Sequence, residues 1–245
     1  MALWESQLPG LAADFRVLRY DLPGHGGSSA ALLREPQPGG TTVEDLAALV
    51  LALIDQQDHD RFHYAGISLG GAIGAQIAVH HPDRLISLAL VCTSAHFGEP
   101  GPWRERAELV RLRGTASLLA TSPGRWFADP RTADTPFCRT LLKNLADADP
   151  VGYAACCDAL ATYDLRADLT RITAPTLVIG GSQDVATPLH HAQELADGIP
   201  GATLRTVGCG HLALEQPQMV QDALTALVRA DPVTPPQPDC AFVAD

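Results

Sequence analysis

Short apolar runs alternate along this chain with stretches in which apolar residues recur at helical spacing. The runs are rich in β-branched and aromatic residues, which favours strands. They cover Phe15–Tyr20, Phe62–Ile67, Leu85–Cys92, Thr176–Ile179 and Thr203–Val207. The third run is continuously apolar, as expected of a strand that is buried on both faces. Strands separated by helices predict an α/β fold with a mostly parallel sheet flanked by helices.

Two helical patterns flank the second apolar run. The first begins at Thr41 or Thr42 and extends through Gln57, and Thr41 with Glu44 has the spacing of a capping box. The second covers Leu69–His80 and follows the strand without a long connection. The second strand and its helix therefore meet at a tight turn.

The segment from residue 96 to residue 168 keeps a helical periodicity but has no strand-like run. We expect it to be a helical cap inserted into a core of residues 1–95 and 169–230. The proline-rich residues 231–245 are expected to form a disordered tail. More than half of the 17 lysine and arginine residues lie in the cap. This concentration favours either the binding of a small anion or an ordinary solvated helix surface.

Composition narrows the class of protein further. The 245 residues are 46% hydrophobic and 18% charged, which is typical of a globular protein with a buried core. A net charge of −11 argues against nucleic acid and against an anionic membrane as partners. The six cysteines form no C-x-x-C pair, and the N-terminus lacks the pattern of a secretory signal. We therefore expect a cytoplasmic protein with reduced thiols.

The junction of the second strand and its helix carries the sequence Gly66-Ile67-Ser68-Leu69-Gly70. A serine between two such glycines at a strand-to-helix turn has its hydroxyl projected above the sheet, where it can act as a nucleophile. The alternative is a simple turn. A nucleophilic serine also needs a base and an acid that orients the base.

Two later strands end in residues of the required types. Asp184 follows the fourth strand, and His211 follows the fifth on a loop that also contains Gly208 and Gly210. The order Ser, Asp, His, with each residue after a strand, is that of a hydrolase catalytic triad. We therefore predict that Ser68, Asp184 and His211 are catalytic.

With these motifs the chain resembles the α/β-hydrolase superfamily over nearly its whole length and, within it, the 3-oxoadipate enol-lactonases. Further matching stretches are Phe15–Asp21, Gly24–Gly26, Asp164–Leu169, Ala174–Val178 and His211–Pro217. The narrower resemblance depends on Arg125-Trp126-Phe127 in the cap. It implies that Arg125 binds a substrate carboxylate and that Trp126 walls the pocket. The alternative is a surface arginine beside a core tryptophan.

The chain departs from this family at the start of the sheet. The resemblance implies three strands before Ala2-Leu3-Trp4, and none of them is in this sequence. The third would lie between the first two strands seen here, and its loop would supply one of two oxyanion-hole N–H groups. The N–H of Leu69 would supply the other. We expect a start upstream of Met1, in preference to a differently closed sheet or another chain in the gap.

The resemblance implies a serine hydrolase that opens an enol-lactone in aromatic catabolism through an acyl-enzyme, with a small anionic lactone or ester as substrate. It implies no cofactor. The doublets His80-His81 and His190-His191 are poor metal motifs, because adjacent residues do not share a helix face. Alternatives are another enzyme of this fold, such as a general carboxylesterase, a carbon–carbon bond hydrolase or a biosynthetic enzyme, and a non-catalytic relative.

Overall fold

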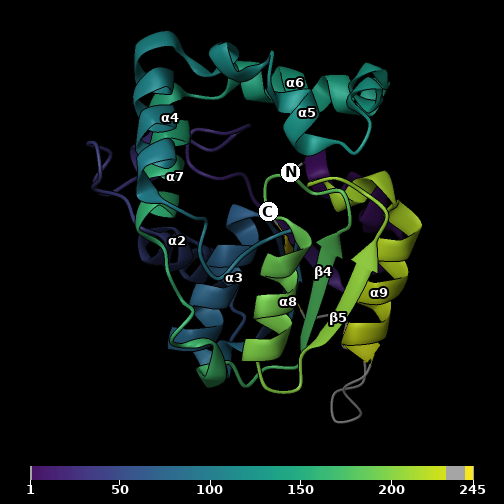
Figure 1. The fold of residues 1–245 in the computed structure, drawn as a ribbon. Coiled ribbons are helices and arrows are strands. Elements are labelled where there is room, and N and C mark those ends of the chain that lie inside the picture. Colours follow the sequence, from purple (N-terminus) through teal and green to yellow (C-terminus); the bar gives the residue numbers. More distant parts are fainter. Residues whose placement is uncertain (1, 230–240, 245) are drawn as a thin grey trace.

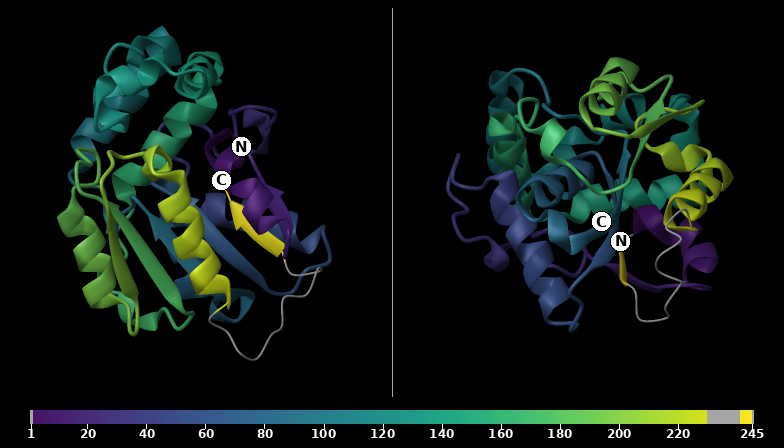
Figure 2. Two further views of the ribbon diagram at one scale, coloured as in Figure 1. Left: turned by 90° about the vertical axis from the view of Figure 1, so that its right-hand side faces the viewer. Right: turned by 90° about the horizontal axis from the view of Figure 1, so that it is seen from below.

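The computed structural model describes residues 2–229 and 241–244, and its fold is a parallel sheet between layers of helices (Figures 1 and 2). The sheet order is β1-β6-β2-β3-β4-β5, and every neighbouring pair is parallel. The strands are β1 (Arg16–Arg19), β2 (Phe62–Ile67), β3 (Leu85–Val91), β4 (Thr176–Gly181), β5 (Thr203–Val207) and β6 (Ala241–Ala244). The predicted α/β-hydrolase fold is confirmed.

Helices cover both faces of the sheet. They are α1 (Leu8–Leu11), α2 (Val43–Asp55), α3 (Leu69–His80), α4 (Pro100–Arg113), α5 (Ser122–Trp126), α6 (Pro136–Asp147), α7 (Pro150–Thr162), α8 (Leu189–Gly198) and α9 (Pro217–Arg229). Ile73 and Leu195 bury α3 and α8 on one face, whereas Trp4 and Leu224 bury the N-terminal turn and α9 on the other. None of the helices in the described residues is long and apolar enough to cross a membrane.

The capping box of α2 lies one residue later in the sequence than predicted. Thr42 is the N-cap and accepts from the N–H of Asp45, whose carboxylate accepts from the N–H of Thr42. The predicted pair, Thr41 and Glu44, does not form the box. Thr41 is buried and donates its hydroxyl to the carbonyl of Glu35 instead, so it serves the preceding loop.

The predicted disordered tail is wrong for residues 241–244, which form β6. This strand lies between β1 and β2, with Val243 in register with Leu18 on one side and with Tyr64 on the other. The rest of the tail, residues 231–240 and 245, lies outside the described residues. Two parallel strands with facing unpaired edges lose backbone hydrogen bonds unless a strand enters between them. β6 therefore occupies the place between β1 and β2 where a strand was expected to be missing, and it closes the sheet in a different way.

The chain between β3 and β4 rises above the carboxyl ends of the strands (Figure 1). In the described structure this segment holds α4, α5, α6 and α7 with short 3-10 turns, and its one extended contact is a bridge between His96 and Asp164. Helices α4 and α7 pack against each other around Ala107, Val110 and Ala154. The segment predicted to be a cap thus covers the edge of the sheet where Ser68 lies.

Candidate active site

Ser68 occupies the turn between β2 and α3 in a conformation that few side chains adopt. Its φ is 55° and its ψ is −115°. A Cβ atom at Gly66 would lie 2.2 Å from the carbonyl carbon of Gly70, so glycine is required there. The N–H of Ser68 donates to the carbonyl of Val91 at 3.0 Å, and Thr93 Oγ1 donates to the Ser68 carbonyl at 2.6 Å. These hydrogen bonds to the end of β3 and to the residues after it hold the turn in its strained conformation.

Asp184 and His211 meet across the ends of β4 and β5, as predicted. His211 Nδ1 lies 2.9 Å from Asp184 Oδ2, and both side chains are buried. The N–H groups of Ala186 and Thr187 donate to Asp184 Oδ1. Burial alone would raise the pKa of Asp184, but its hydrogen bonds to His211 and Thr187 outweigh burial and lower it. Asp184 is therefore held as a carboxylate that fixes the orientation of the imidazole.

Ser68 and His211 line the same cavity, whose volume is about 180 Å³. Within the described residues, no hydrogen bond joins the Ser68 hydroxyl to His211. Such contacts are often loose in a protein without substrate and tighten when one binds. Leu69 is the first residue of α3, so its N–H has no acceptor inside the helix and points to the end where Ser68 lies. The sequence motifs do not identify a second hydrogen-bond donor for the oxyanion.

Arg125 and Trp126 lie at the end of α5 and line this cavity together with Ser68. Both side chains are half-buried. Burial lowers the pKa of Arg125, and the positive charge of Arg106 lowers it further. Among the described residues, no carboxylate forms an ion pair with Arg125 and none lines the cavity. The two cap residues predicted to face the substrate thus face the cavity that holds the nucleophile.

The sequence motifs did not identify two of the residues that line this cavity. Arg106 on α4 and Tyr153 on α7 also line the cavity, and Arg106 donates hydrogen bonds from Nε and Nη2 to Tyr153 Oη at 3.0 and 2.7 Å. The concentration of arginine in the cap was the signal that could have indicated Arg106. The pair is separated by 47 positions, so only the packing of α4 on α7 reveals it.

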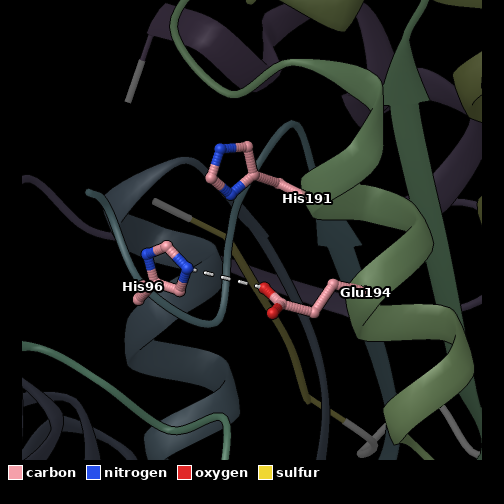
Figure 3. A group of neighbouring side chains, drawn as sticks. All are labelled: His96, His191 and Glu194. Atoms are coloured by element: carbon pink, nitrogen blue, oxygen red, sulfur yellow. Dashed lines mark ion pairs between the residues drawn. The ribbon is translucent and has the colours of Figure 1, made fainter.

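A second group of polar side chains lies between β3 and α8, where His96, His191 and Glu194 approach one another (Figure 3). Ser94 donates its hydroxyl to the carbonyl of His96, so Ser94 Oγ accepts from His191 Nδ1 at 2.6 Å. The N–H of Gly98 donates to His96 Nδ1, which leaves the hydrogen of neutral His96 on Nε2, 3.9 Å from Glu194. That nitrogen is a donor, so this arrangement favours a hydrogen-bonded cluster over a metal site.

Comparisons with known proteins show the family to which the chain belongs. Residues 1–217 match the family model described as the alpha/beta hydrolase fold. The chain is 34% identical over 231 residues to 3-oxoadipate enol-lactonase 2 of Acinetobacter baylyi, covering 94% of this chain and 84% of that protein. It is also 34% identical over 220 residues to a Stutzerimonas stutzeri protein named as a carbamate hydrolase, RutD, covering 85% and 79%.

A solved structure gives the same result. The crystal structure of the enol-lactonase from Burkholderia xenovorans LB400 superposes with a TM-score of 0.87 at 33% sequence identity, covering 93% of this chain and 86% of that one. Two of these relatives are named enol-lactonases and one is named a carbamate hydrolase, so the shared property is hydrolysis. The chain belongs to the α/β-hydrolase family and is a hydrolase that acts on ester bonds.

Proposed function

We propose that the chain opens an enol-lactone of the 3-oxoadipate type by serine catalysis. The observation that carries this proposal is one cavity lined by Ser68, by His211 and by Arg125, whose guanidinium forms no ion pair among the described residues. A lactone with a free carboxylate supplies both groups that this cavity matches, a reactive carbonyl and an anion. Relatives named enol-lactonases at 33–34% identity support the proposal.

The first half of the reaction forms an acyl-enzyme. Ser68 Oγ attacks the lactone carbonyl while His211 accepts the serine proton, and Asp184 stabilises the imidazolium that results. The carbonyl electron pair moves to oxygen, where the N–H of Leu69 donates a hydrogen bond. When the carbonyl re-forms, the ring C–O bond breaks, and the enol oxygen leaves with the proton that His211 returns.

The second half regenerates the serine. A water molecule loses a proton to His211 and attacks the acyl carbon, and the bond from that carbon to Ser68 Oγ then breaks. His211 returns the proton to the serine, and the product leaves as a carboxylate. Arg125 binds the second carboxylate through both halves, and Trp126 closes the wall of the pocket. These steps require only the side chains described and water.

The experiment that tests this proposal is the replacement Arg125→Gln, assayed on 3-oxoadipate enol-lactone and on p-nitrophenyl acetate. We expect kcat/KM to fall about 10- to 10²-fold on the lactone, since a charge-assisted hydrogen bond contributes about 1.5–3 kcal/mol, and to change little on the neutral ester. Arg131→Gln is the matched control, because Arg131 is an exposed cap arginine paired with Asp129. Equal losses on both substrates would contradict the proposed carboxylate contact and favour a general carboxylesterase.

The non-catalytic alternative has its own test. Ser68→Ala removes the nucleophile and should lower kcat by at least about 10⁴-fold, with no burst of p-nitrophenolate. Ser117→Ala is the control, because Ser117 is exposed on the cap and its hydroxyl donates to the Gly114 carbonyl of its own turn. A wild-type protein with no activity on any ester or lactone would instead support a ligand-binding relative.

A further inference from the structure

The contact between Arg106 and Tyr153 fixes where the tyrosine can donate a hydrogen bond. The guanidinium donates from Nε at 3.0 Å and from Nη2 at 2.7 Å to the same phenol oxygen. A phenol oxygen has two lone pairs and one hydrogen, so these two bonds fill its capacity as an acceptor. The remaining hydrogen must point away from Arg106.

This hydrogen has no acceptor among the described residues of the protein. The polar contacts of Tyr153 Oη are those with Arg106, and its ring lies 5.8 Å from the ring of His25. Burial raises the pKa of Tyr153, and the nearby charge of Arg106 opposes this rise only in part. The phenol therefore remains protonated at neutral pH and keeps an uncommitted O–H.

Tyr153 lines the cavity that contains Ser68 and His211, and it also lines an adjoining cavity of about 280 Å³ that shares Ser68 and Leu69. Tyr153 on α7 of the cap and Ser68 and Leu69 at the start of α3 therefore line the same two cavities. The guanidinium of Arg106 also lies over the ring of Tyr153, with its Cζ 5.7 Å from the ring centre. The same arginine therefore restrains both the ring and the hydroxyl.

The start of α7 is locked to the core, so this part of the cap is held at a fixed distance from the sheet. The N–H of Asp149 donates to the carbonyl of Gly24 at 2.7 Å. A Cβ atom at Gly152 would lie 2.6 Å from the Cα of Gly24, which shows how closely the two backbones pack. Tyr153 follows directly, so backbone contacts fix the part of α7 from which it lines the cavity.

We propose that Tyr153 donates the second hydrogen bond to the oxyanion formed at Ser68, and that Arg106 is the positioning residue that directs its hydroxyl. The Leu69 N–H is the other donor, and tetrahedral oxyanions are stabilised by two such donors in most acyl-transfer sites. Tyr153 donates a hydrogen bond and keeps its proton, which leaves proton transfer to His211. This inference rests on acyl transfer at Ser68 but not on the choice of an enol-lactone.

The test is Tyr153→Phe, measured on p-nitrophenyl acetate, which carries no carboxylate and so does not depend on the enol-lactone proposal. We expect kcat/KM to fall by about 10²–10³-fold, as for the loss of one oxyanion donor. The affinity for a trifluoromethyl ketone, which forms an oxyanion on the serine, should fall by the same factor. Tyr163→Phe is the matched control, since Tyr163 donates to the Ala72 carbonyl and does not line the cavity.

The role of Arg106 is tested by Arg106→Met alone and together with Tyr153→Phe on the same ester. If Arg106 acts through the tyrosine, the double variant is no slower than Tyr153→Phe alone. Additive losses would overturn the positioning role. An unchanged ketone affinity in Tyr153→Phe, or a loss confined to KM, would overturn the oxyanion role. If the wild type hydrolyses the lactone but not p-nitrophenyl esters, the rates of wild type and Tyr153→Phe are compared on the lactone, and the same outcomes support or overturn the oxyanion role.

Discussion

Thr187 Oγ1 donates a 2.7 Å hydrogen bond to Asp184 Oδ2, the same oxygen that lies 2.9 Å from His211 Nδ1. The threonine is buried, so it gives this carboxylate a donor that water cannot replace. Thr187→Val keeps the shape and removes the donor. We expect the free energy of unfolding to fall by about 1.5–3 kcal/mol, measured by urea denaturation at pH 7. A loss below about 0.5 kcal/mol would contradict a structural role for this bond.

The lowered pKa of Asp184 predicts how stability depends on pH. A carboxyl group whose pKa is lower in the folded state than its ordinary value of about 3.9 stabilises the fold above that value. The contribution disappears as pH falls through the folded-state pKa. Asp184→Asn should therefore remove part of the acid-induced loss of stability below about pH 4. It should also lower kcat by about 10⁴-fold, because an amide N–H that donates to Nδ1 leaves the imidazole in the wrong tautomer to act as a base. Unfolding followed from pH 7 to pH 2 checks the first effect.

The positive φ of Ser68 predicts a conflict between stability and activity at the nucleophile. Backbone strain of this kind costs about 1–3 kcal/mol, and glycine avoids it because it has no Cβ. Ser68→Gly should therefore be inactive but more stable than wild type, by about 1 kcal/mol after the greater freedom of glycine in the unfolded chain is included. Ser68→Ala keeps the Cβ and the strain, so it should show no such gain. Thermal melting of both variants separates the two cases.

Local patterns in the sequence were sufficient for most of the fold and for the contact between Asp184 and His211. The run Phe62–Ile67 and the helix Leu69–His80 have the bounds that were predicted, because a buried strand and its helix are encoded within one short stretch. Ser68, Asp184 and His211 were singled out as candidates because each follows a strand end. Arg106 and Tyr153 were missed, since their contact depends on how two cap helices pack.

The least predictable element was the strand at the end of the chain. Ala241–Ala244 is a short apolar segment after a proline-rich stretch, and nothing nearby marks it as a central strand. Its pairing is set by the edges of β1 and β2, which lie more than 170 residues away in the sequence. Pairing at such separation is a property of the assembled sheet, so no local pattern indicates it.

The position of β6 predicts that a proline there will damage the protein. Val243 lies in register with Leu18 and Tyr64, so the Val243→Pro change removes an N–H from a strand with partners on both sides. We expect a loss of at least about 1–3 kcal/mol and a melting temperature lower by several degrees. Val243→Thr keeps both the N–H and the β-branch, and serves as the control. Identical melting temperatures for the two variants would show that residues 241–244 do not pair within the folded sheet. A lower melting temperature in the proline variant alone, together with reduced turnover of p-nitrophenyl acetate, would link this strand to β2, the strand that ends at Ser68.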